Sequence, residues 1–177
     1  MGLMIYKLIN NLRFFKKNNI YISKSANISL LTKVRVLKEG KIKIGSNSKI
    51  YENCLIDAGK SKLIIGNNVK IHRLCTLSAG KYSRLIIGDN VLIAEKTSIF
   101  ASNHQFKEKN ILINQRGVIS KGIVIEDDVW IGVNCIILDG VKIAKGCVIG
   151  GGSVVTKNTE PYGIYVGNPA RKIGERV

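Results

Sequence analysis

A six-residue spacing between aliphatic residues is the feature that most constrains the fold of this chain. Near the C-terminal end the spacing runs without a break through Ile125, Ile131, Ile137, Ile143, Ile149 and Val155. Upstream it recurs in sets of three: Ile22, Ile28 and Val34; Ile44, Ile50 and Ile56; Ile65, Ile71 and Leu77; Ile87, Ile93 and Ile99. Such repeats indicate stacked units that bury their apolar faces on one another. We predict that each set is one turn of a three-sided coil and that the chain forms about six coils.

The segments between these sets all fall at the same place in the coil. The step from the third side of one coil to the first side of the next is ten residues, nine, ten and finally twenty-six, from Ile99 to Ile125. A stack of parallel strands explains this, because the sides must pair at about 4.8 Å per coil while a corner can bulge outward. We therefore expect one all-β domain, a single-stranded parallel β-helix, with a protruding loop at 100–124.

Small residues occupy a second column, four positions after the aliphatic residues, and this column contains all four cysteines. Its members are Ala26, Thr32, Ser48, Cys54, Val69, Cys75, Val91, Thr97, Val129, Cys135, Val141, Cys147 and Ser153. We expect them to turn into a narrow interior, where larger side chains would overpack. The cysteines are then small buried hydrophobes in a reducing compartment, and the absence of a CxxC spacing argues against disulfides and metal.

Glycine recurs directly after the aliphatic position, at Gly45, Gly66, Gly88, Gly132 and Gly150. Glycine at this place suits a tight or left-handed backbone conformation.

The chain is strongly basic, with 28 Lys and Arg against 12 Asp and Glu and a formal net charge of +16. This charge predicts anionic partners without choosing among them. The basic residues are scattered along the chain and no nucleic-acid-binding motif is present, so we expect no nucleic acid partner.

Residues 1–20 form a basic amphipathic segment that we expect to contain a short helix, with apolar residues from Ile5 to Phe15 on one side. Polar residues interrupt it, so it fits neither a signal peptide nor a membrane span. We expect one of two roles for this segment. It packs on the end of the domain or on a neighbouring subunit, or residues 3–17 contact a membrane surface. We expect the β-helix at 21–157 and a C-terminal tail at 158–177. We also expect a cytoplasmic location, and one at the inner face of the membrane if residues 3–17 contact a membrane.

Four sequence blocks occur in order with matching gaps: IIGDNVLIA at 86–94, IVIEDDVWIG at 123–132, VIGGGSVVTKN at 148–158 and VGNPARKI at 166–173. Together they resemble the hexapeptide-repeat acyltransferases, in the branch of the galactoside, maltose, capsule and lipopolysaccharide O-acetyltransferases. The first forty residues match poorly. The resemblance implies a left-handed β-helix, an exception to the usual crossover handedness, and a homotrimer with sites between subunits. It also implies acetyl transfer from acetyl-CoA to a hydroxyl of a sugar or a cell-surface polysaccharide precursor.

His104 lies in the segment FASNHQF at the start of the longest insertion. An alcohol needs a base to accept its proton as the new bond forms, and histidine suits this near neutral pH. In the resembled family the histidine of this loop is the catalytic base, which assigns that role to His104; the alternative is a solvated loop histidine. We also assign Asn103 and His72 to the acceptor. His72 stands where galactoside acetyltransferases carry an acceptor-binding asparagine, so it indicates a different acceptor or is a surface residue.

For the cofactor, the resemblance places Trp130, Gly132 and Val133 beside the pantetheine, with the Val133 amide as the donor to the thioester oxygen. Gly151, Thr156, Lys157 and Arg171 match positions that contact CoA. Lys157 and Arg171 suit the phosphates. The alternatives are ordinary packing for Trp130 and solvated surface charge for the two cations.

Three other functions remain in competition. The γ-class carbonic anhydrases share the fold but hold zinc through three histidines, and this chain has only two. A sugar-nucleotide N-acetyltransferase would also use a base such as His104. A non-catalytic β-helix scaffold would have no need of the loop histidine or of the basic C-terminal block.

Overall fold

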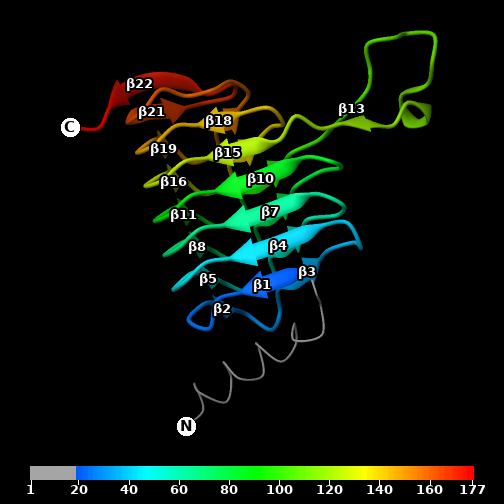
Figure 1. Cartoon of the computed structure of the whole chain (residues 1–177). Helices are drawn as coiled ribbons and strands as arrows, with labels where there is room; N and C mark the ends of the chain where they lie inside the picture. Colours follow the sequence, from blue (N-terminus) through cyan, green and yellow to red (C-terminus); the bar gives the residue numbers. More distant parts are fainter. Residues whose placement is uncertain (1–18) are drawn as a thin grey trace.

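The structure is a computed structural model, and it describes residues 19–177. The predicted N-terminal helix and its membrane contact lie outside the described residues. The chain winds into a three-sided prism of stacked coils, with one sheet on each side (Figure 1). Among residues 19–177, no helix is long and apolar enough to cross a membrane.

The three sheets take one strand from each coil in turn, and all their strands are parallel except β22 at the end of sheet B. Sheet A contains β1 (Ile20–Ile22), β4 (Lys41–Ile44), β7 (Lys62–Ile65), β10 (Arg84–Ile87), β15 (Ile123–Ile125) and β18 (Lys142–Ile143). Sheet B contains β2 (Asn27–Ile28), β5 (Lys49–Ile50), β8 (Lys70–Ile71), β11 (Leu92–Ile93), β16 (Trp130–Ile131), β19 (Val148–Ile149), β21 (Gly163–Val166) and β22 (Arg171–Glu175). Sheet C contains β3 (Lys33–Arg35), β6 (Leu55–Asp57), β9 (Thr76–Ser78), β12 (Ser98–Phe100), β17 (Ile136–Ile137) and β20 (Val154–Val155).

The direction of the strands gives the hand of the coil. In Figure 1 the strands of sheet A face the viewer and run from right to left while the chain rises from the blue end to the red end. A chain that turns clockwise, seen from above, as it rises toward the observer is left-handed. The prediction of a left-handed β-helix of about six coils is therefore confirmed.

The predicted aliphatic positions stack in register along the prism axis. On sheet A, Ile44 pairs with Ile65, and the same row continues through Ile87, Ile125 and Ile143. These side chains are almost completely buried. Burial of one such side chain contributes about 1.5–3 kcal/mol, so the stack is the main source of stability. The small-residue column, including the four cysteines, is buried as predicted.

A second set of inward side chains was not anticipated. In the longer strands of sheet A, Ile42, Leu63, Leu85 and Ile123 also point into the core, and at the end of sheet C the core is completed by Ala58, Ala79 and Ala101. The six-residue pattern gave one inward residue per side. The insertions lengthen the strands that flank them and so place a second residue inside.

The repeated glycines are explained by close packing and not by a left-handed backbone. None of the five has a positive φ. A Cβ added to Gly66 would lie 2.5 Å from the carbonyl oxygen of Gly88 in the next coil. The left-handed positions come two residues later, at the corner, where asparagine recurs at Asn47, Asn68 and Asn90. Asparagine tolerates that conformation better than most residues do.

The corner between sheets C and A carries every insertion, as predicted, and the longest one leaves the prism. It contains β13 (Asn103–His104), the short 3-10 helix η1 (Ile113–Gln115) and β14 (Val118–Ile119). Residues 158–177, expected as a C-terminal tail, instead extend sheet B at the same end of the prism. They add β21 in parallel to β19, and β22 returns antiparallel to β21 (Figure 1).

Candidate functional site

His104 lies at the stem of the projecting loop. Its strand β13 pairs antiparallel with β14, so that His104 is opposite Val118 and Asn103 is opposite Ile119. The Gln105 amide also donates to the Gly117 carbonyl oxygen at 3.2 Å. The side chains of His104 and Asn103 are exposed. Within residues 19–177 of one chain, the His104 imidazole has no hydrogen-bond partner, so it is free to meet a ligand.

Arg116 braces this loop from inside. Its Nη2 atom donates to Glu108 Oε1 at 2.8 Å and to Gln105 Oε1 at 3.5 Å, and the side chain is only 12% exposed. The sequence reasoning missed it. The signal was present, because Arg116 and Glu108 are the only Arg and the only acid between 100 and 124. The brace ties Arg116 to Gln105, the residue next to His104, and to Glu108 further along the loop.

The residues assigned to the pantetheine meet at the corner between sheets B and C. Trp130 on β16 is 50% exposed and Val133 follows it at the corner. A Cβ on Gly132 would lie 2.6 Å from the Gly151 amide nitrogen, and one on Gly151 would lie 3.1 Å from Val133 Cγ1. Gly132, Gly151 and Val133 are therefore closely packed against one another. Within the described part of the chain the Val133 N–H has no acceptor, which leaves it available to an external oxygen.

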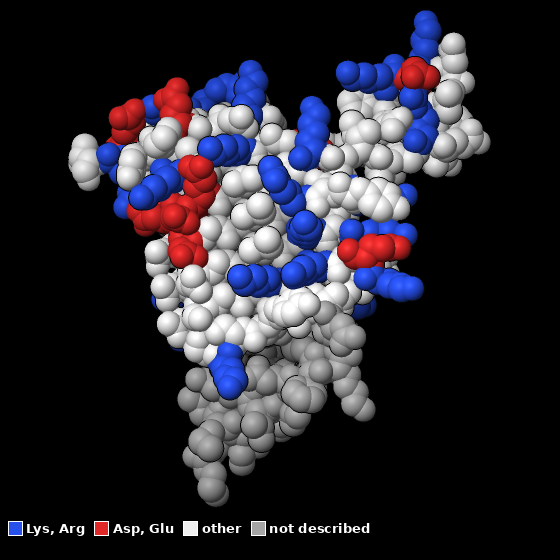
Figure 2. Space-filling model, in the orientation of Figure 1, with Lys and Arg blue, Asp and Glu red and all other residues white. Residues whose placement is uncertain are grey.

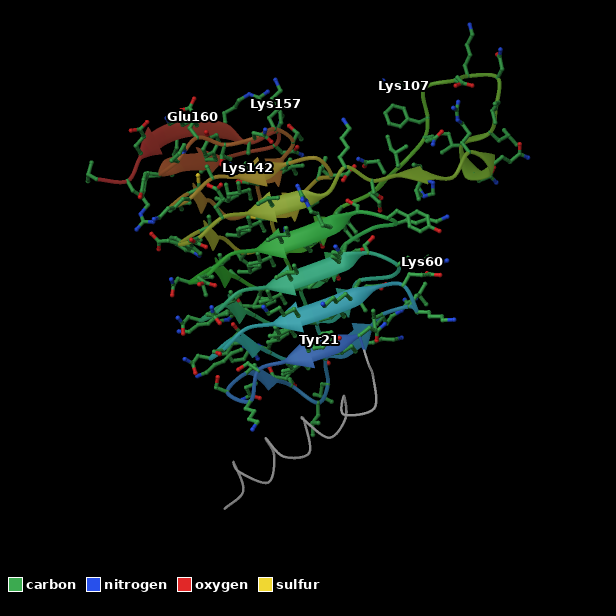
Figure 3. The ribbon with its side chains drawn as sticks, in the orientation of Figure 1. Tyr21, Lys60, Lys107, Lys142, Lys157 and Glu160 are labelled. Atoms are coloured by element: carbon green, nitrogen blue, oxygen red, sulfur yellow. The ribbon has the colours of Figure 1, made fainter. Side chains whose placement is uncertain are left out.

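Lys157 and Arg171 line one pocket of about 200 Å³ beside the C-terminal hairpin, together with Val155, Asn158 and Tyr165. Figure 3 shows Lys157 rising from this end of the prism. Thr156 lies next to Lys157 and is exposed. Two of the predicted cofactor residues are thus brought together around a small concave surface.

The cations of this region divide into two kinds. Lys172 is ion-paired with Glu160 and Glu175, and Arg176 Nη1 lies 2.9 Å from Asp128 Oδ2. In contrast, neither Lys157 nor Arg171 has an acidic partner among residues 19–177. Cations left unpaired beside a pocket are suited to bind an anionic ligand.

His72 lies on the corner between sheets B and C, in the coils below. Its Nδ1 atom is 3.0 Å from Glu95 Oε1, and its ring stacks on Tyr51 with the centroids 4.9 Å apart. The pKa of the Glu95 carboxyl is lowered, chiefly by a hydrogen bond from the Glu95 backbone and next by the hydrogen bond with the His72 imidazole. Glu95 and Tyr51 were missed by the sequence reasoning. The coil register predicts Tyr51, because Ile50 pairs with Ile71. It places Ala94 opposite His72 and Glu95 one residue further on.

His104 and Val133, the predicted base and the predicted thioester donor, lie far apart within one chain. His104 leaves from the corner between sheets C and A, whereas Val133 lies at the corner between sheets B and C. About seven residues of one coil separate the two corners, which is on the order of 20 Å at the rise of a β-strand. One chain by itself therefore keeps these two predicted site residues apart.

The cysteines take no part in this arrangement. All four are free and buried. Burial raises the pKa of the Cys135 thiol and keeps it neutral and unreactive. Within residues 19–177, no group of three His, Cys, Asp or Glu side chains is placed to hold a metal ion.

Comparison with known proteins supports the hexapeptide-repeat transferase family. Residues 122–157 match the family model described as bacterial transferase hexapeptide (six repeats). The chain is 40% identical over 91 residues to a Schizosaccharomyces pombe protein that carries the name acetyltransferase, over 50% of this chain and 42% of that protein. The chain spans only 32%, 42% and 25% of the lengths of the three curated relatives that it matches.

Two solved structures share the fold over most of the chain. One is AntD, an N-acyltransferase from Bacillus cereus in complex with dTDP and 3-hydroxybutyryl-CoA, with a TM-score of 0.80, 26% identity, and coverage of 94% of this chain and 88% of that chain. The other is the polySia-specific acetyltransferase NeuO, with a TM-score of 0.74, 29% identity, and coverage of 88% and 66%. Solved structures of this fold therefore include both an N-acyltransferase and a polySia-specific acetyltransferase.

Proposed function

We propose that this protein is an acetyltransferase that moves the acetyl group of acetyl-CoA to a hydroxyl of a sugar or a cell-surface polysaccharide precursor. The observation that carries the proposal is a set of polar groups at one end of the prism that have no acidic partner or hydrogen-bond acceptor within residues 19–177. Lys157 and Arg171, which have no acidic partner within residues 19–177, suit the phosphates of CoA. The Val133 N–H, which has no acceptor there, suits the thioester oxygen. The buried free thiols fit a reducing cytoplasmic location.

His104 acts as the general base in this proposal. Its imidazole accepts the proton of the acceptor hydroxyl while the hydroxyl oxygen bonds to the thioester carbonyl carbon. The Val133 N–H stabilises the negative charge that develops on the carbonyl oxygen, a contribution of about 3 kcal/mol for such a donor. As the carbon–sulfur bond breaks, the imidazolium returns its proton to the leaving CoA sulfur. Asn103 and His72 are assigned to the acceptor.

We propose further that the site is completed between copies of the chain, in a homotrimer. The separation of His104 from Val133 within one chain supports this. So does the tip of the loop, where large apolar side chains are exposed and surround a hollow of about 520 Å³: Phe106, Ile111, Leu112 and Ile113. Contact with a second copy would bury them, and such burial is favourable.

The second candidate is a sugar-nucleotide N-acetyltransferase. It is favoured by the similarity to AntD, whose structure contains dTDP together with an acyl-CoA. The same base and the same cofactor residues would serve an amine acceptor, because the proton that leaves the attacking nitrogen also needs an acceptor.

The experiment follows release of the CoA thiol from acetyl-CoA over a panel of free sugars, oligosaccharides, nucleotide sugars and amino sugars, using the full chain. We expect release with a hydroxyl acceptor and an alkali-labile ester in the product. An alkali-stable amide would favour the N-acetyltransferase. If no acceptor releases thiol, the enzyme proposal fails and a β-helix scaffold becomes the better account.

A further inference from the structure

Sheet A carries a basic outer face that the proposed transfer reaction does not use. Figure 2 shows Lys and Arg side chains running down the front of the molecule over this sheet. The register explains the pattern, because Lys41 pairs with Lys62 and Lys62 pairs with Arg84. The three exposed cations therefore form a straight row along the prism axis, about 4.8 Å apart from coil to coil.

Two cations of the row, Lys62 and Arg84, lack in the described part of the chain the acidic partners that other basic residues have, while Lys41 Nζ lies 4.7 Å from the centroid of the Tyr21 ring. Lys142, higher on the same face, is paired with Glu126 at 2.7 Å, and Lys60 is paired with Glu39 at 3.2 Å. Neither Lys62 nor Arg84 has an acidic side chain within ion-pair distance among residues 19–177. Like charges stacked at this spacing repel one another, so binding of an anion to the row relieves the repulsion and lowers the free energy.

The row borders a pocket of about 470 Å³ at the corner between sheets C and A, and Lys62 and Arg84 belong to both. Basic side chains, hydroxyls and one aromatic ring line it: Lys60, Lys62, Arg84, Lys121, Ser61, Ser83, Ser120 and Tyr82. The one acid that lines it, Glu39, is already paired with Lys60. Its composition fits a carboxylate or a phosphate group.

The pocket adjoins the stem of the loop that carries His104. Ser120 and Lys121 directly follow β14, which pairs with β13. The Ser120 hydroxyl accepts a hydrogen bond from the Lys81 amide at 3.1 Å and so ties the stem to the prism. A chain lying along the row and through the pocket would therefore lead to the proposed catalytic base.

We propose that the basic face of sheet A binds a linear anionic glycan, with acidic groups along the row of Lys41, Lys62 and Arg84 and one acidic group in the pocket. This inference rests on the proposed function and narrows its acceptor to an acidic polysaccharide chain. A linear occupant fits the axial row, and a concave pocket fits a discrete group better than a flat lipid surface. The acidic corner between sheets A and B, red at the left of Figure 2, confines a polyanion to the row.

Binding is measured by fluorescence anisotropy with end-labelled oligogalacturonate as the anionic probe and labelled malto-oligosaccharide of equal length as the neutral probe. The test variant is Lys62→Gln with Arg84→Gln. The matched control is Lys49→Gln with Lys70→Gln, an equally exposed register pair on sheet B that loses the same charge. Circular dichroism confirms that each variant is folded, and vesicles with and without phosphatidylglycerol test a lipid surface.

We expect the wild type to bind the anionic probe and not the neutral one, with affinity that falls as salt is added. The sheet A variant should bind about 10- to 100-fold more weakly, since each charge-assisted contact is worth roughly tenfold. The sheet B control should change less than about twofold.

Three results would overturn the inference. Equal losses in the two variants would mean that net charge alone attracts the probe, and absence of binding would remove the site. Binding to anionic vesicles that depends on sheet A, without binding of the oligosaccharide, would assign the face to a membrane. The binding assay needs no turnover, so loss of the transferase proposal and loss of this site are observed separately.

Discussion

The prism and the loop at 100–124 are built on opposite principles. In the prism each coil is hydrogen-bonded to the coil below it, and the side chains of rows such as Ile65 and Ile87 are buried. The loop has one two-stranded ladder and the Arg116 brace, and most of its side chains are exposed. Register forces the sides of the coil to be regular, whereas a corner is free to vary. The stacked prism therefore supplies the stability, and it also carries the proposed cofactor groups, whereas the proposed base lies on the irregular loop.

The largest effect that would test this separation is expected from His104→Ala. We predict a loss of about 10²- to 10⁴-fold in kcat, the usual contribution of a general base, with an unchanged melting temperature. Steady-state thiol release and thermal unfolding measure the two quantities. Lys107→Ala, a neighbouring exposed residue of the same loop, is the control and should retain activity. Near-normal turnover in His104→Ala would remove the histidine from the mechanism.

The converse test is a core substitution in the prism. Leu77 is fully buried, and Leu77→Ala should lower the free energy of unfolding by about 2–5 kcal/mol because it leaves a cavity. Urea denaturation measures the change, and Thr76→Ala on the outer side of the same strand is the control. Turnover by the folded fraction should stay close to normal. A stability loss below about 1 kcal/mol would contradict the stacked core.

A smaller effect is expected from Arg116→Gln, which tests whether the order of the loop affects activity without changing the stability of the prism. Loss of the contact with Glu108 should loosen the loop and lower kcat several-fold, since a misplaced base slows the reaction. The melting temperature should hardly move. A double-mutant cycle with Glu108→Gln tests the pairing, because the two losses should not add. Additive losses would show that Arg116 acts through other contacts.

Much of the fold could be predicted from the sequence, because the repeat is local. The spacing of Ile87, Ile93 and Ile99 gave the sides of one coil, and the unequal gaps gave the corner that bears the loop. Other features could not be predicted in this way. The inward position of Leu85 depends on how far the insertion extends its strand, and the reason for Gly66 depends on the backbone of the next coil.

The candidate site shows the same limit. Loop length and resemblance singled out His104, and motif resemblance singled out Lys157 and Arg171, but no pattern in the sequence stated which cations are unpaired. That property depends on Glu160, Glu175 and Asp128, which pair with Lys172 and Arg176 instead. The Arg116–Glu108 pair likewise forms only when the loop folds back on itself.

The sequence by itself determined that this chain would be a three-sided stack with one irregular corner, since a six-residue period repeats the same local geometry at every side. The tertiary structure alone decided which outer residues become neighbours. Lys41, Lys62 and Arg84 are about twenty residues apart along the chain and adjacent in the sheet. Register across coils sets those contacts, and the lengths of the corner segments set the register.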